Sequence, residues 1–350
     1  MRLVKATVME SKMPHIWIIN HYADSPSGSS GIRHYSLSVA LKKCGWSSTV
    51  ISSNIDHSTG KKRSLMKERM RKEDVEGVPF LWIKGPEYAS DGLARMFNML
   101  IFFLRMLPSS TTNILPNPDI IMGSTVHPLA ALAGLILSKR KKVPFVYEIR
   151  DLWPRTLIDM GKIKENGIVA KLLGGLETYL YEQASTVVTL LPNVDEYFAD
   201  KGLPTEKIVW ISNGVDIEKF PLTVYDAQTE LSEFKLMYVG AHGNANCLYT
   251  LLNAYKKFTD LQASEHPLYT KLVLIGSGNL KSALKAYAGS LSVSGGDIEF
   301  WDSVPKDSVS QVLQTADAFV ITVRDLPELY RYGISTVSYT HLTLPTIYSV

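Results

Sequence analysis

The sequence has little of what several broad protein classes require. It holds only two cysteines in 350 residues, Cys44 and Cys247. They lie far apart, so they indicate neither a disulfide framework nor a metal site, and a reducing cytoplasm fits. The net charge of +3 is too small to indicate a nucleic-acid partner. The longest apolar run, residues 96–107, is interrupted by Asn98 and Arg105 and is too short to span a membrane.

Several motifs that carry cofactor or metal chemistry are also missing. No Gly-Lys-Ser/Thr follows a glycine-rich loop, and no Gly-x-Ser-x-Gly elbow occurs. Gly276 and Gly278 lack the third glycine of a dinucleotide fingerprint, whose place Lys281 takes, which disfavours NAD chemistry. The histidines lack zinc-site spacing and no Asp-x-Asp pair is present. We therefore expect neither a bound cofactor nor a metal.

Both ends of the chain carry expectations of their own. The first twelve residues are charged and lack an apolar core, so we expect no signal peptide, and Met13 is a possible start. Residues 337–350 have no charged side chain and no helical or α/β period, and they resemble a reading frame of a sequencing-library adapter. We expect the natural protein to continue beyond Thr336; the alternative is a natural C-terminal strand.

The length and the alternation of elements predict two α/β domains. Short apolar strands alternate with helices in both halves, beginning with a strand over 15–20, a helix over 32–43 and a strand over 48–52. This order predicts doubly wound parallel sheets. The expected domains are 13–212 and 213–336, followed by the 337–350 tail. The basic stretch 61–72 is expected to be a mobile loop.

A turn marks the boundary between the two halves. The apolar run 207–211 is typical of a buried strand, and Asn213 and Gly214 follow it as a turn. A turn at such a boundary either lines a cleft between two domains or is a plain surface turn.

The glycine-rich loop after the first strand is a candidate binding element. It contains Gly28, Ser29, Ser30 and Gly31, and Arg33 lies in the first turn of the helix that follows. Backbone N–H groups of such a loop, together with the helix N-terminus, bind phosphate or hydroxyl oxygens. The alternative is a tight turn without a ligand.

A second candidate is the segment Arg150-Asp151-Leu152-Trp153-Pro154, which follows a buried strand. Ligands of open α/β sheets bind outside the carboxyl ends of the strands. Charged side chains at that place are therefore candidates for a site, although a structural Arg–Asp pair is the alternative.

Together these motifs are more specific than any one of them. Over residues 14–336 the chain resembles the retaining GT-B glycosyltransferases of family 4, and it is most similar to the WbuB-like branch, which adds N-acetyl-L-fucosamine or a related sugar during O-antigen assembly. The resemblance is carried by the Gly28–Gly31 loop with Arg33, the Arg150–Pro154 segment, the Ile211–Asp216 segment with Phe220, and, in the second half, Tyr238–Gly240, Leu274–Gly278, Ile298–Asp302 and Ala316-Asp317.

The resemblance implies a GT-B fold of two Rossmann-like domains facing a cleft, the second one incomplete. The first domain would bind the acceptor, a polyprenyl-linked or glycan precursor of a cell-surface polysaccharide. The second domain would bind the co-substrate, a nucleotide-diphosphate sugar that we expect to be UDP-linked. Asp151 would orient the reacting sugar or acceptor, with Arg150 beside it. The implied donor-binding residues are Asn213, Gly214, Gly240, His242, Gly243, Gly276, Gly278, Trp301 and Val304.

The sequence departs from the family pattern at two places. Ala241, His242, Asn244 and Asn246 stand where members often carry the Arg and Lys that counter the diphosphate, and the family's acidic pair is replaced by Tyr330 and the tail. Two other functions stay open: a non-transferase GT-B enzyme such as a nucleotide-sugar 2-epimerase, and a non-catalytic sugar-binding scaffold.

The expected location is cytoplasmic, at the inner face of the plasma membrane. Residues 93–107 are apolar and hold Arg95 and Arg105, and basic clusters lie at 61–72 and 139–142. Such a combination favours peripheral contact with anionic lipid; a core helix with solvated loops is the alternative.

Overall fold

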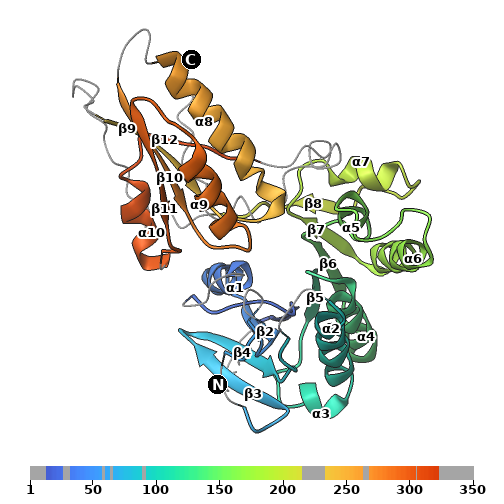
Figure 1. The fold of residues 1–350 in the computed structure, drawn as a ribbon. Helices are drawn as coiled ribbons and strands as arrows, with labels where there is room; N and C mark the ends of the chain where they lie inside the picture. The colour runs from blue at the N-terminus through green and yellow to red at the C-terminus, as the bar shows by residue number, and fades with distance from the viewer. Residues whose placement is uncertain are drawn as a thin grey trace, which may run out of the picture. The chain divides into compact units, whose positions relative to one another are not determined.

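The computed structural model divides the chain into two compact units, Met1–Ser212 (unit 1) and Asn213–Val350 (unit 2). The structure describes residues 13–26, 32–56, 60–63, 66–88, 92–214, 233–262, 268–304 and 306–322. Each unit is a sheet of parallel strands, with one antiparallel edge strand in unit 1, and helices pack on it (Figure 1).

Unit 1 is built on an eight-stranded sheet in the order β3-β4-β2-β1-β5-β6-β7-β8. All neighbouring pairs are parallel except β3 with β4. The strands are β1 (His15–Ile19), β2 (Ser47–Ser53), β3 (Met70–Val75), β4 (Val78–Ile83), β5 (Ile120–Thr125), β6 (Phe145–Ile149), β7 (Thr186–Thr189) and β8 (Ile208–Trp210). The helices are α1 (Arg33–Lys43), α2 (Leu93–Met106), α3 (Ser109–Thr112), α4 (Pro128–Lys141), α5 (Arg155–Asp159), α6 (Ile168–Gln183) and α7 (Val194–Ala199).

Helices cover both faces of this sheet because its central strands are apolar on both sides. On one face Trp17 and Ile19 of β1 pack with Phe102 of α2 and with α4. On the other face Ile16 and Ile18 pack with α1. The close packing of α4 on β5 needs Gly123, where a Cβ would lie 2.8 Å from the Ala131 Cα atom.

Two expectations for this unit were wrong. The run 207–211, expected to be a buried strand, forms the edge strand β8, which leaves Val209 and Trp210 exposed. Residues 70–72, expected at the end of a mobile loop, begin strand β3, which forms an antiparallel hairpin with β4. Its charged side chains gave no apolar alternation, because β3 is an edge strand with half of its residues exposed.

Unit 2 has a four-stranded parallel sheet in the order β11-β10-β9-β12. Leu272 and Leu274 face α8 and α9, whereas Val273 and Ile275 face α10. Alternate residues of one strand thus pack on opposite layers. The elements are β9 (Glu233–Val239), η2 (Asn244–Asn246), α8 (Leu248–Gln262), β10 (Tyr269–Ile275), α9 (Lys281–Ser290), β11 (Gly296–Trp301), α10 (Lys306–Leu313) and β12 (Ala318–Phe319).

Candidate functional site

The order in which strands are added to the sheet of unit 1 reverses between β1 and β5, which are parallel neighbours. Strands β2 and β4 lie on one side of β1, and β5, β6 and β7 lie on the other. A crevice at the carboxyl ends of the strands is the usual ligand site at such a reversal. The residues that leave β1, β5 and β6 at this edge therefore define the first half of the candidate site.

A buried polar cluster occupies the reversal point. His21 follows β1, His127 follows β5, and a distance of 2.6 Å joins His21 Nδ1 to His127 Nε2, so one ring donates its N–H to the other. Asn20 donates to Ser124 Oγ at 2.8 Å. Burial, with Arg95 nearby, lowers the pKa of His127 to about 3 and keeps this ring neutral. Among the described residues, His127 Nδ1 has no hydrogen-bond partner.

The sequence motifs did not predict this pair. The two histidines are 106 residues apart, and neither belongs to a recognisable motif. The available signal was their position directly after two strands, which becomes informative only once those strands are known to be neighbours.

A second buried cluster surrounds Glu148, near the end of β6. Its Oε1 accepts from Arg33 Nε at 2.9 Å and its Oε2 from His34 Nε2 at 2.7 Å. Burial alone would raise the pKa of Glu148, but His34, Arg33 and Arg150 hold that pKa well below its usual value. Burial lowers the pKa of His34. We therefore assign the charge pair to Arg33 and Glu148, with His34 donating as a neutral ring.

Arg150 and Asp151 lie where the sequence predicts, directly after β6. The Arg150 N–H donates to Thr125 Oγ1 at 3.0 Å, and Thr125 Oγ1 donates to the Glu148 carbonyl at 3.1 Å. The segment is thereby bonded to the end of β5, and both charged residues are half-buried. Whether they act on a substrate stays a prediction.

In unit 2 the loops that leave β9 and β10 contact each other. His242 N–H donates to the Ser277 carbonyl at 2.9 Å, and Leu280 N–H to the His242 carbonyl at 3.0 Å. Only glycine fits at this contact: a Cβ on Gly276 would lie 1.9 Å from the Gly240 carbonyl oxygen, and one on Gly278 would lie 2.4 Å from that of His242. The structure thus brings Gly240, His242, Gly276 and Gly278 together.

Lys281 extends this pair of loops to a third strand. Its Nζ donates to the carbonyls of Gly276 and Trp301 at 2.7 and 2.6 Å and to Asp302 at 2.7 Å. Lys281 therefore joins the ends of β10 and β11 at the start of α9. In the sequence this lysine stood out only because it takes the place of the third glycine of a dinucleotide fingerprint.

His242 is fully buried, and among the described residues neither of its ring nitrogens has a hydrogen-bond partner. Burial, with Lys281 and Lys285 nearby, lowers its pKa to about 4. The ring is neutral at pH 7 and does not replace the missing counter-charge of the family pattern.

The other predicted residues are less closely tied to these loops. Gly243 is the residue after His242 in the loop that leaves β9. Trp301 is the last residue of β11, and Val304 lies in the loop that follows this strand. Asn213 is buried and Gly214 exposed at the beginning of unit 2. Gly28, Ser29, Ser30 and Gly31 lie outside the described residues. Arg33 lies within the described residues. All three of its guanidinium nitrogens donate within unit 1, one to Glu148 and the other two to the carbonyls of Ile211 and Ser212.

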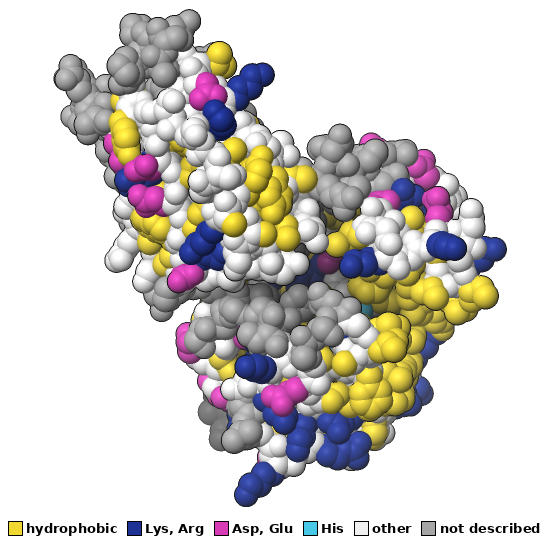
Figure 2. Space-filling model, viewed as in Figure 1, with side chains coloured by type: hydrophobic (Ala, Val, Ile, Leu, Met, Phe, Trp, Pro, Cys, Tyr) yellow, Lys and Arg dark blue, Asp and Glu magenta, His cyan; other side chains and the backbone are white. Residues whose placement is uncertain are grey.

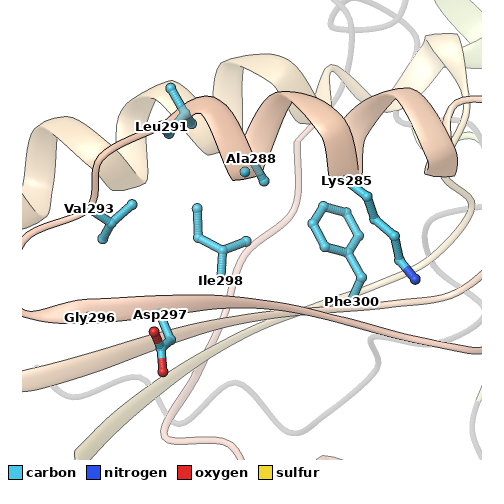
Figure 3. A pocket seen from close by; sticks show the side chains of 9 residues that line it. Lys285, Ala288, Leu291, Val293, Gly296, Asp297, Ile298 and Phe300 are labelled. Atoms are coloured by element: carbon cyan, nitrogen blue, oxygen red, sulfur yellow. The ribbon is translucent and has the colours of Figure 1, made fainter.

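A hollow of about 470 Å³ lies between α9 and the edge strand β11 (Figure 3). Apolar side chains such as Leu291 and Phe300 line it together with polar groups, with Lys285 near one end and Asp297 near the other. It runs beside β11 instead of crossing the strand ends, so we assign it no part in the site. Among the described residues, no cluster of His, Cys, Asp or Glu side chains could hold a metal ion.

Comparison with known proteins places this geometry in context. A model of the glycosyl transferase 4-like domain matches residues 30–214, more than half of the chain. The probable glycosyltransferase WbjE of Pseudomonas aeruginosa is 21% identical over 256 residues, which cover 71% of this chain and 60% of that protein. The chain thus spans about 60% of the length of this curated relative.

Two solved structures share the fold. Sucrose-phosphate synthase from Thermosynechococcus elongatus superposes with a TM-score of 0.63 at 15% identity, covering 88% of this chain and 75% of that one. HepE of Anabaena, in complex with UDP and glucose, gives a TM-score of 0.55 at 13% identity, covering 89% and 74%. These similarities show the expected GT-B class of two Rossmann-like α/β units.

Proposed function

Because the chain belongs to the glycosyl transferase 4-like family, we propose that it is a glycosyltransferase of the hexosyltransferase type, which moves a sugar from a nucleotide-diphosphate donor to an acceptor. The observation that carries the proposal is the pair of touching glycine loops at the ends of β9 and β10. The N–H groups of Gly240, His242 and Gly276 donate to carbonyls within unit 2. Other amides of these loops would stabilise charge on a departing diphosphate. The UDP held by the structurally similar HepE supports a UDP-linked donor.

The proposed division of labour follows the strand ends. Unit 2 would bind the nucleotide through residues 240–243 and 276–278. Unit 1 would bind the acceptor, with Asp151 orienting the reacting group and Arg150 beside it. The proposed transfer retains the anomeric configuration without a bound metal, and the sugar is N-acetyl-L-fucosamine or a related one for an O-antigen or capsule.

The test is a two-substrate assay with the chain and with a full-length form. UDP release from UDP-sugars is measured with and without a polyprenyl-diphosphate-linked saccharide, and NMR of the product reports the anomeric configuration. We expect acceptor-dependent UDP release and a retained configuration. Conversion of the donor sugar without an acceptor would instead identify the epimerase, and the absence of binding, hydrolysis and transfer with every donor would contradict an enzymatic role.

We propose further that unit 1 binds the surface of an anionic membrane through α2. Among the described residues, no helix is long and apolar enough to cross a membrane. Helix α2 buries Met99 and Phe102 but leaves Leu93, Met96 and Leu100 exposed. Figure 2 shows hydrophobic side chains gathered over α2, with Lys and Arg side chains along their lower edge. An apolar face with adjacent cations is the arrangement that binds anionic lipid reversibly.

Flotation with vesicles of anionic or neutral lipid tests this surface. We expect flotation with anionic vesicles only, weakened by salt. Leu100→Glu should abolish it, whereas Phe258→Glu, a matched change at an exposed position of α8 in unit 2, should not. Equal and negligible flotation with both lipids would exclude the membrane.

A further inference from the structure

Arg33 connects two parts of unit 1 that are far apart in the sequence. Its Nε donates to the Glu148 carboxylate at 2.9 Å. Its two terminal nitrogens point to other partners: Nη1 donates to the Ser212 carbonyl and Nη2 to the Ile211 carbonyl, both at 2.9 Å. The three acceptors are bonded to three different nitrogens of one planar guanidinium, and the single nitrogen of a lysine ammonium cannot stand at all three positions.

The other side of this contact is rigid. Glu148 is fully buried in the central sheet, and its second oxygen is bonded to the buried ring of His34. An ionised carboxylate in such a place requires its cation, because an unpaired buried charge is strongly destabilising. The guanidinium of Arg33 is therefore held in one orientation by Glu148, and its terminal nitrogens are aimed at the chain that follows β8.

Within the described residues, few other hydrogen bonds hold that chain; one runs from Trp210 Nε1 to the Leu190 carbonyl at 3.2 Å. Strand β8 has only three residues, pairs with β7 alone at the edge of the sheet, and exposes Val209 and Trp210. Beyond it, the Ile211 N–H donates to the Thr189 carbonyl at 2.8 Å. Ser212 is the last residue of unit 1. The two carbonyl bonds of Arg33 therefore lie at the point where the backbone leaves this unit.

We propose that Arg33, oriented by Glu148, is a positioning residue that fixes the last two residues of unit 1, Ile211 and Ser212, where the backbone leaves this unit. Glu148 lies on β6, two residues before Arg150, which begins the segment after this strand. One guanidinium thus joins β6, the strand that leads into the candidate catalytic segment, to the last two residues of unit 1. Loss of this contact frees residues 211–212 while the sheet stays intact.

Amide hydrogen exchange on the full chain tests the proposal without reference to activity. Arg33→Lys keeps a cation near Glu148, but its single nitrogen cannot take the positions of all three guanidinium nitrogens, and Glu148→Gln removes the charge that orients Arg33. Both variants should accelerate exchange at Ile211 on the order of tenfold, because the hydrogen bonds from a charged group to the Ile211 and Ser212 carbonyls are lost or weakened. Exchange in β6 and β7 should stay unchanged. Arg71→Lys, at an exposed pair with Glu73, is the matched control and should alter neither.

A second readout separates positioning from ligand binding. This part rests on the proposed function: Arg33→Lys should lower kcat while the calorimetric affinity for UDP stays within about twofold, because the proposed nucleotide loops belong to unit 2. Unchanged exchange at Ile211 in Arg33→Lys would overturn the inference, as would equal acceleration throughout β6, β7 and β8. If Glu148→Gln does not fold, Arg33→Lys alone decides. If no transfer is ever found, the exchange result still stands or fails by itself.

Discussion

Gly278→Ala tests the contact between the two glycine loops of unit 2. A Cβ at this position would lie 2.4 Å from the His242 carbonyl oxygen, 2.6 Å from its carbon and 2.8 Å from its nitrogen. Non-bonded carbon contacts are comfortable at about 3.5–4.0 Å, so one loop must move by roughly 1 Å. The His242 backbone cannot yield alone, since its N–H and carbonyl are bonded to Ser277 and Leu280.

The expected cost is that of overpacking, about 1–3 kcal/mol. We therefore expect thermal unfolding of the chain to begin several degrees lower in Gly278→Ala. The displaced loop should also weaken UDP binding, measured by titration calorimetry, by at least about tenfold if its amides hold the diphosphate.

Gly289→Ala is the control. Gly289 lies in α9, and no atom is within 4 Å of the Cβ that the change adds. Alanine is the better helix former, so this variant should be unchanged or more stable by up to about 1 kcal/mol, with normal UDP affinity. Equal stability and equal UDP affinity of Gly278→Ala and the unaltered chain would refute the loop contact; destabilisation with normal affinity would leave the contact and remove the donor site.

Three further predictions concern single side chains. Asp151→Asn should lower kcat strongly with little change in thermal stability; activity within about threefold of the original, roughly 0.65 kcal/mol of barrier, would exclude a chemical role. Lys281→Met removes the donor to three oxygens and should destabilise unit 2 by about 1–3 kcal/mol in denaturant titrations, whereas Lys256→Met, at an exposed ion pair, should cost at most about 1 kcal/mol; equal losses would contradict the bridging role. Burial raises the pKa of Glu177 to about 7 despite Lys201, so the folded chain holds a proton that the unfolded chain loses above about pH 4.5, and stability should fall as pH rises to about 7. Glu177→Gln should flatten that fall in melting curves recorded from pH 4.5 to 8, and an unaltered slope would assign the pH dependence to another group.

The sequence by itself determined the features that depend on neighbouring residues. Apolar runs identified the central strands, because a strand that is buried on both faces must be apolar along its length. The sequence also predicted where these strands end, because a glycine or a charged residue interrupts each apolar run. Arg150, Asp151, Gly240 and Gly276 were therefore placed correctly at carboxyl ends before the order of the strands was known.

The tertiary structure alone decided which of these ends meet. His21 and His127 are 106 residues apart, and Arg33 is 115 residues from Glu148 and 179 from Ser212. These groups meet because β1 lies beside β5, β5 beside β6, and β8 at the end of the same sheet. Hydrophobic periodicity reports only whether a strand is buried, not which strand lies beside it, because any apolar strand offers its neighbour the same backbone groups. The order of the strands is set by the packing of α1, α2 and α4 on the two faces, and it is this packing that buries Glu148 beside its arginine.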